Sequence, residues 1–307
     1  MKALVNLGGG GVAVEIAEVP EPEPVMSEAV VEVGAVAVNR GELRLLAARQ
    51  PGWRPGQDVA GVVVRPAEDG SGPGEGSRVV AWPEQEGWAQ RVAVPTTHLA
   101  TLAPEVSLPA AATLPVAGIT ALRLLRAGGD LSGQQLLITG AAGGVGRFAV
   151  ELAAGAGGHV TGVVSGDGRG TGLTELGASS IVHDIDDAEG QFDLILESVG
   201  GASLEASVRL VAPGGRIIIF GNSSNSPATI SFGDFRGRSG AQITAFFVYE
   251  SGEPPAFGED LQLLADMTAE GALHPQIGLE APWTESNTVF EALANRQVNG
   301  KAVLVVE

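Results

Sequence analysis

The spacing of apolar residues divides the chain into two kinds of segment. The first third carries short β-branched runs bounded by Gly and Pro, and the clearest of these are 29–38 (AVVEVGAVAV) and 59–64 (VAGVVV). A helical stripe of Leu and Ala follows at 118–127 (GITALRLLRA). We therefore expect irregular β structure with turn-rich connections before the first long helix.

From residue 134 the pattern changes to apolar runs of strand length that alternate with helical segments. The first expected strand is 135–139 (QLLIT), and the amphipathic helix 147–156 (RFAVELAAGA) follows it. Further strands are expected at 159–164, 180–183, 192–199, 215–221 and 301–306. Because strands spaced by helices form βαβ units, the pattern predicts an α/β fold with a parallel sheet.

A glycine-rich turn, 141–146 (AAGGVG), joins the first expected strand of this region to its helix. Dinucleotide-binding turns have this context, since glycine lets the backbone approach a pyrophosphate and the helix N-terminus offers N–H donors. Ala141 stands where the G-x-G-x-x-G pattern has its first Gly, and a turn that merely reverses the chain is the alternative. The expected cofactor contacts in the turn are Ala142, Gly143, Gly144, Val145 and Gly146.

The residues that follow the strand 159–164 predict which cofactor binds. An NAD-selective domain usually has an acidic residue about 20 residues after the turn, bonded to the ribose 2′-OH. Ser165, which is small and neutral, stands near this position, and Arg169 follows at a distance that suits a 2′-phosphate. Asp167 is the contrary signal, and a solvated Arg169 is the alternative. We expect NADPH.

Composition and charge exclude several classes of protein. The 307 residues, 44% of them hydrophobic, suffice for about two domains. A formal net charge of −18 repels phosphate backbones and anionic membranes, so we expect neither nucleic acid nor a membrane as partner. The chain has no Cys, which removes thiolate metal sites. Without a signal-peptide pattern or a long apolar run, we expect a cytoplasmic protein.

Several motifs together resemble the zinc-free quinone oxidoreductase branch of the medium-chain dehydrogenase/reductase superfamily, over nearly the whole length. They are Val38–Asn39, 56–61 (GQDVAG), 114–121 (LPVAGITA), the AAGGVG turn, 197–201 (ESVGG), 213–216 (PGGR) and 300–304 (GKAVL). The resemblance implies a GroES-like, β-barrel-type substrate lobe from residues 1–114 and 250–307. It implies a doubly wound Rossmann lobe from residues 115–249, with the active site in a cleft. It also puts Arg169 where similar proteins hold the 2′-phosphate.

Departures from zinc-dependent relatives bear on the chemistry. Those relatives place a Cys where Asn39 stands and a His where Gln57 stands, so we expect no metal. Without a Lewis acid, a conjugated acceptor is the easier target, because it spreads the incoming charge onto oxygen. Several enone-reducing relatives carry a Tyr near the substrate, whereas the one Tyr here, Tyr249, lies outside those segments.

Asn39 is the candidate catalytic residue, as a polar group beside the nicotinamide ribose and the substrate oxygen. A turn-forming Asn at a strand end is the alternative. Glu42 and Asp58 fall where zinc relatives keep acidic groups near the metal, and we expect a structural ion pair there rather than a general acid. The remaining cofactor-binding candidates are Thr120, Val199, Phe220, Gly221 and Lys301. A Thr that bonds its own helix and a Val in the core are the alternatives for two of them.

These observations predict an NADPH-dependent reductase of quinones or activated alkenes, with a small-molecule substrate. The alternatives are a pathway-specific enoyl-thioester or ene-reductase, and a non-catalytic NADPH-binding structural or sensor protein. The apolar run 243–248 (ITAFFV) predicts an exposed sheet edge, which a second copy would cover. We therefore expect a homodimer, with a covering segment of the same chain as the alternative.

Overall fold

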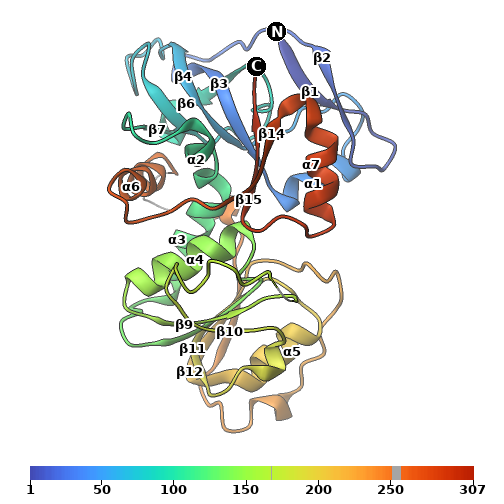
Figure 1. The fold of residues 1–307 in the computed structure, drawn as a ribbon, viewed down its shortest axis with the longest axis vertical. Coiled ribbons are helices and arrows are strands. Elements are labelled where there is room, and N and C mark those ends of the chain that lie inside the picture. The colour runs from blue at the N-terminus through green and yellow to red at the C-terminus, as the bar shows by residue number, and fades with distance from the viewer. Residues whose placement is uncertain (167, 251–256) are drawn as a thin grey trace. The chain divides into compact units, whose positions relative to one another are not determined.

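Two compact units make up the chain in the computed structural model, which describes residues 1–166, 168–250 and 257–307 (Figure 1). One unit holds Met1–Ile119 and Glu253–Glu307, and the other holds Thr120–Gly252.

The first boundary between the units differs from the expected one, which opened the Rossmann lobe at residue 115. A π-helical turn, η2 (Leu114–Gly118), packs within the first unit. The Val116 N–H donates to the Asp58 carboxylate over 2.8 Å, and a Cβ on Gly118 would lie 3.0 Å from Leu264. These contacts keep the turn with the first unit. The second expected boundary, after residue 249, stands beside residues 251–256, which lie outside the described residues.

The first unit is built on a mostly antiparallel sheet. Its strand order is β14 (Ile277–Pro282), β15 (Lys301–Val305), β3 (Glu28–Val38), β4 (Asp58–Arg65), β5 (Arg78–Ala81) and β7 (Leu99–Thr101), and β6 (Arg91–Pro95) also pairs with β3. A separate hairpin joins β1 (Lys2–Asn6) to β2 (Val14–Glu18). The described helices and helical turns are α1 (Arg40–Ala48), η1 (Thr96–His98), α2 (Leu108–Ala112), α6 (Phe257–Ala269), η6 (Trp283–Glu285) and α7 (Ser286–Ala294).

β3 explains why both chain ends belong to this unit. The strand is buried along most of its length, because it pairs with β4 and β6 and, near its end, with β15. The register sets Ala302 of β15 opposite Val38, so the last strand lies beside the end of β3. Trp88 and Phe290, both almost fully buried, join the same apolar core. The position of Asn39, directly after β3, is therefore fixed by this core.

The second unit contains a six-stranded sheet in which every pair is parallel. Its order is β10 (Ala178–Val182), β9 (His159–Val163), β8 (Gln135–Thr139), β11 (Phe192–Glu197), β12 (Val211–Ile219) and β13 (Gln242–Ala245). Its described helices and turns are α3 (Ile119–Gly128), α4 (Gly144–Gly155), η3 (Ile185–Asp187), α5 (Ala202–Leu210), η4 (Phe232–Phe235) and η5 (Val248–Glu250) (Figure 1).

Both faces of the parallel sheet are covered, as successive residues of β11 show. Leu194 lies against Gly128 at the end of α3, whereas Ile195 clusters with Ala206 and Val208 of α5. Neighbouring side chains of a strand point to opposite faces, so these helices lie on opposite sides of the sheet. The strand order reverses direction beside β8, which defines the switch point of a doubly wound fold. The expected α/β class is confirmed.

The connection from β9 to β10 departs from the expected alternation of strands and helices. Its described residues 168–177 form turns instead of a helix. Gly168 and Gly172 have φ of +78° and +81°, in the left-handed region that only Gly adopts at little cost. Gly also weakens a helix by about 1 kcal/mol per residue. The glycine content of this stretch therefore accounts for the turns.

The last strand of the parallel sheet is shorter than the predicted run 243–248. β13 ends at Ala245, and the chain then turns into η5, where Val248 is buried. The strand does lie at the sheet edge, paired only with β12 among the described residues. Phe247 and Tyr249 are 60% and 55% exposed.

None of the described helices is long and apolar enough to cross a membrane. The cytoplasmic location stays a prediction.

Candidate active site

Four polar side chains form a group, the Asn39 network, in which Asn39 is half-buried and Glu42, Asp58 and Lys301 are buried. Asn39 follows β3 in an extended conformation and begins α1 as its N-cap residue. The Glu42 carboxylate, three residues later, accepts the Asn39 backbone N–H at 2.9 Å. This is half of a capping box and it fixes the start of the helix. The strand end and the helix start therefore deliver two of the four groups.

The side-chain amide of Asn39 is fully used as a donor. Its Nδ2 donates to Asp58 Oδ2 at 2.9 Å and to Glu42 Oε2 at 3.2 Å, and its Oδ1 accepts from Lys301 Nζ at 2.6 Å. An amide has two N–H donors, and its oxygen has two lone pairs. Asn39 can therefore accept one more hydrogen bond, but it cannot polarise a substrate oxygen as a donor without breaking the network.

Lys301 and Asp58 form a buried ion pair. Lys301 Nζ lies 2.7 Å from Asp58 Oδ2, and the two side chains are 3% and 0% exposed. The other carboxylate oxygen of Asp58 accepts the Val116 N–H at 2.8 Å. The expected structural ion pair at Asp58 is present, with a partner from the last strand. Lys301, a candidate for cofactor binding, has one of its three ammonium donors left after these contacts.

Glu42 holds its proton more tightly than an ordinary carboxyl. Burial, and next the charge of Asp58, raise the pKa of Glu42 to about 8, against the opposing effects of Asn39 and Lys301. Glu42 is 1% exposed, and its Oε1 accepts the Gln57 N–H at 3.0 Å. The network contains two carboxyl groups and one ammonium. Because Lys301 balances Asp58, charging Glu42 as well leaves an uncompensated buried anion.

The donor set of this site is unlike that of a zinc centre. Asn39 and Gln57 are amides, and the Gln57 side chain donates to the Glu84 carbonyl over 3.2 Å. Zinc in proteins is held mainly by thiolate and imidazole. The described residues contain no group of three or more His, Cys, Asp or Glu placed to hold a metal.

The glycine turn of the second unit has the geometry of a phosphate cradle. The left-handed residue is Gly140, with φ +66°, so the tight bend comes one residue before Ala141. The replacement of the first motif Gly by Ala141 therefore carries no penalty. A Cβ on Gly146 would meet the Gly140 carbonyl and lie 2.7 Å from the Ala141 Cα. Gly143 precedes α4 as its N-cap, and the first N–H groups of a helix are donors for anions.

The carboxyl edge of the parallel sheet gathers most of the other candidates. β8, β9, β11 and β12 are parallel neighbours, so the residues after them share one edge with the glycine turn. The candidates at this edge are Ser165, Arg169, Val199, Phe220 and Gly221. Thr120, by contrast, is buried in the first turn of α3 and follows no strand.

Glu197, which the sequence did not single out as a site residue, fixes the loop that carries Val199. It is fully buried at the end of β11, and its carboxylate accepts from the Val199 and Gly200 N–H groups and from the hydroxyls of Ser203 and Thr139, at 2.9–3.3 Å. A buried carboxylate with four hydrogen-bond donors holds the backbone of the loop that supplies them. The sequence does contain one indication of this role, because Glu197 is an acidic residue at the end of an otherwise apolar strand.

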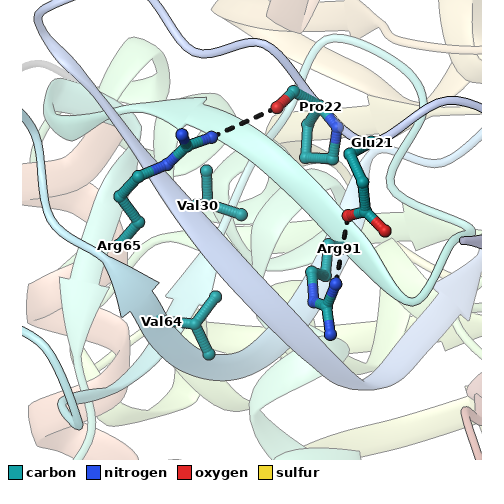
Figure 2. A pocket seen from close by; sticks show the side chains of 6 residues that line it. All are labelled: Glu21, Pro22, Val30, Val64, Arg65 and Arg91. Carbon is teal, nitrogen blue, oxygen red and sulfur yellow. Dashed lines mark hydrogen bonds and ion pairs between the residues drawn. The ribbon is translucent and has the colours of Figure 1, made fainter.

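A shallow hollow in the first unit lies outside both candidate regions (Figure 2). Its lining residues are Glu21, Pro22, Val30, Val64, Arg65 and Arg91. Figure 2 shows that both cations are engaged: Arg65 donates to the Pro22 carbonyl at 3.2 Å, and Arg91 pairs with Glu21 at 3.1 Å. No residue predicted for the site lines it.

Comparisons with known proteins define the family. Residues 175–304 match the model of a zinc-binding dehydrogenase family. The polyketide synthase protein NorB of the spectinabilin system from Streptomyces orinoci is 31% identical over 82% of this chain, which spans 12% of NorB. A chloroplast envelope quinone oxidoreductase homolog of Arabidopsis thaliana is 28% identical over 97% of this chain and 96% of its own length.

Solved structures show the same fold. Escherichia coli quinone oxidoreductase, solved with NADPH, superposes with a TM-score of 0.88 over 99% of this chain and 100% of its own, at 21% identity. The chain belongs to the quinone oxidoreductase branch of the medium-chain dehydrogenase/reductase superfamily, whose members are oxidoreductases.

Proposed function

We propose that the chain is an NADPH-dependent reductase of quinones or activated alkenes that works without a metal. One observation carries the proposal: the positions that hold zinc ligands in related dehydrogenases are amides, and Asn39 is tied into a closed network with Lys301 and Asp58. A site without a Lewis acid favours an acceptor that delocalises the incoming charge by itself. The membership of the quinone oxidoreductase branch supports this acceptor class.

The residues present fit a dinucleotide. Gly146 leaves no room for a Cβ between α4 and the turn, and Gly143 opens a twelve-residue helix with its N–H groups towards the strand end. These N–H groups would hold the pyrophosphate, and Arg169 would hold the 2′-phosphate. Bound NADPH supplies a hydride to the acceptor. The chain's own residues bind, orient and exclude water.

Asn39 and Lys301 have defined roles in this proposal. The free lone pair of Asn39 Oδ1 would accept a hydroxyl of the cofactor ribose, and the third donor of Lys301 would be available to the cofactor or substrate. Asn39 cannot give a proton to the product, because an amide has no acidic proton.

A turnover assay tests the proposal. NADPH oxidation by the purified protein is followed with a series of quinones and α,β-unsaturated ketones, and with thioesters of 2-enoic acids as a separate series. The proposal expects turnover with members of the first series. Binding of NADPH without turnover by any acceptor supports a non-catalytic binder and overturns it.

An enoyl-thioester substrate is the second candidate, and the likeness to the NorB segment favours it. A preference of at least about tenfold in kcat/KM for thioesters over free ketones and quinones, equal to about 1.4 kcal/mol of transition-state binding, would establish this alternative. The net charge of −18 disfavours coenzyme A, whose phosphates it repels.

We also propose a homodimer formed through β13. The strand is an edge with exposed residues, and Phe247 beside it is 60% exposed. An unpaired apolar edge is covered when the same strand of a second copy pairs with it about a two-fold axis. Ala245→Lys should shift the protein towards monomer in light scattering. Glu75→Lys, in an exposed loop of the other unit, is the control and should leave the mass unchanged. A wild-type mass near 31 kDa would contradict the dimer.

A further inference from the structure

A buried arginine lies on the first turn of α4, directly after the glycine turn. Arg147 is 5% exposed. Its Nε donates to the Ala142 carbonyl at 3.3 Å, and its Nη2 donates to the Thr171 carbonyl at 2.8 Å. In the described part of the chain no carboxylate forms an ion pair with it. A charged side chain so placed after a phosphate-binding turn calls for an explanation, because burying an unpaired charge is costly.

The second partner of Arg147 belongs to the glycine-built connection between β9 and β10. Two backbone hydrogen bonds within it, Arg169 N to Gly166 O and Thr171 N to Gly168 O, are long at 3.4 Å. A Cβ on Gly172 would lie 3.3 Å from Arg147 Nη1, so the guanidinium rests against this segment. Arg147 thus joins the glycine turn to residues 168–172, and we name this pair of elements the β9 corner.

The electrostatics of the β9 corner favour an anion. The pKa of Arg147 is lowered, first by burial and second by the positive charge of Arg169. Two guanidinium groups therefore repel each other in one corner of a chain whose net charge is −18. A phosphate placed between such groups relieves the repulsion and accepts charge-assisted hydrogen bonds.

We propose that Arg147 is a positioning and specificity-determining residue, which holds the segment carrying Arg169 against the glycine turn and makes the β9 corner select a cofactor with a phosphate on its adenosine ribose. This inference rests on the proposed cofactor. Two arginines therefore select the cofactor. Arg169 would contact its phosphate, and the buried Arg147 sets the position of Arg169.

Equilibrium binding tests the proposal without any need for turnover. Dissociation constants for NADPH, NADH, adenosine 2′,5′-bisphosphate and 5′-AMP are measured for wild type, Arg147→Gln and the control Arg216→Gln. Arg216 is exposed in the same unit and also donates to a carbonyl, that of Ala127. We expect Arg147→Gln to weaken NADPH and the bisphosphate about tenfold or more, and to change NADH and 5′-AMP less than about twofold. Arg216→Gln should change none of the four.

Arg147→Lys keeps the charge but cannot donate to the Ala142 and Thr171 carbonyls at the same time, as a guanidinium does. This variant tests the proposal if Arg147→Gln does not fold. A positioning role predicts that Lys recovers only part of the NADPH-to-NADH affinity ratio. An unchanged ratio in Arg147→Lys together with an unchanged or unfolded Arg147→Gln would overturn the proposal. Equal loss of NADPH and NADH affinity would also overturn it, since that is the result of a structural role alone.

The outcome is separable from that of the proposed function. A wild-type protein that prefers NADPH but reduces none of the acceptors refutes the reductase and leaves the β9 corner intact. A wild-type protein that reduces quinones with equal affinity for both cofactors refutes the corner and leaves the reductase intact.

Discussion

The Asn39 network and the β9 corner handle buried charge in opposite ways. In the network the chain supplies its own counter-ion: Lys301 lies 2.7 Å from Asp58, and Asn39 bonds to both. In the corner two arginines approach each other, and Arg147 has only carbonyl partners. The network therefore keeps its shape without a ligand. The corner, by contrast, is stabilised by a bound anion, because the anion reduces the repulsion between the two arginines. The first unit therefore holds a self-balanced group of charges, and the second unit holds the corner that we propose for the charged end of the cofactor.

Removal of the counter-ion from the network should give the largest effect. Asp58→Asn leaves the buried Lys301 ammonium without its counter-ion, with only the Asn39 oxygen to accept from it, which should cost about 3–5 kcal/mol in the free energy of unfolding. Asp186→Asn is the control, because its ion pair with Arg209 has a similar length of 2.7 Å but is exposed. It should cost about 0–1 kcal/mol. Denaturant unfolding of both variants measures the difference, and similar losses would refute the view that the network is a closed, buried unit.

A side chain in the glycine turn should give the next largest effect. Gly146→Ala places a methyl group against the Gly140 carbonyl and 2.7 Å from the Ala141 Cα, so the helix must move away from the strand. We expect a loss of about 1–3 kcal/mol in stability and weaker binding of both nicotinamide cofactors. Gly155→Ala, at the other end of α4 with open space around it, should be neutral or stabilise by up to about 1 kcal/mol. Calorimetry with and without cofactor checks both.

Loss of Arg169, the half-buried cation of the corner, should affect the binding of one cofactor only. Arg169→Ala should weaken NADPH binding by about 1.5–3 kcal/mol, the value of a hydrogen bond to a charged group, and leave NADH binding unchanged. Arg209→Ala, which removes an exposed arginine of the same unit, is the matched control. Titration calorimetry gives the two affinities. Equal NADPH and NADH affinity already in the wild type would remove the basis for this prediction.

The smallest effect is a pH dependence that belongs to the network. The folded protein keeps the Glu42 proton up to about pH 8, whereas the unfolded chain releases it near the ordinary glutamate pKa of 4.5. The free energy of unfolding is therefore not reduced by Glu42 below pH 4.5, and it falls as the pH rises from there towards 8. Glu42→Gln lacks this loss, so its Tm minus that of wild type should increase from pH 5 to pH 8 and then level off. Exposed Glu75→Gln should show no such slope, and a flat Glu42→Gln difference would contradict the raised pKa.

Local patterns were sufficient for the fold of the parallel sheet. β8 has the predicted bounds, because a buried run between turn residues has few alternatives as a structure. The turn was also predicted, although the role of its first Gly falls to Gly140. The connection from β9 to β10 was predicted less well, since the expected alternation of strands and helices fails where glycines adopt left-handed conformations. The predicted strand 243–248 overran β13 because burial of Val248 ends the edge strand early.

The candidate site was predicted less completely than the fold. Asn39 and Lys301 are 262 residues apart, and no local pattern reports that their side chains meet. The acceptor role of Asn39 depends on that contact. Arg147 was missed for a different reason, because an arginine early in a helix is usually exposed to solvent. Its burial follows from the turns of residues 168–172, which only the three-dimensional structure shows.

The central claim is that a metal-free protein transfers hydride from NADPH to a conjugated acceptor. Its most direct test uses NADPH deuterated at the transferred position, an α,β-unsaturated ketone, and protein dialysed against a chelator with its zinc content measured. The account predicts deuterium on the β-carbon of the saturated ketone at an undiminished rate, with no stoichiometric zinc. A product without deuterium, or turnover that appears only when zinc is added back, would contradict it.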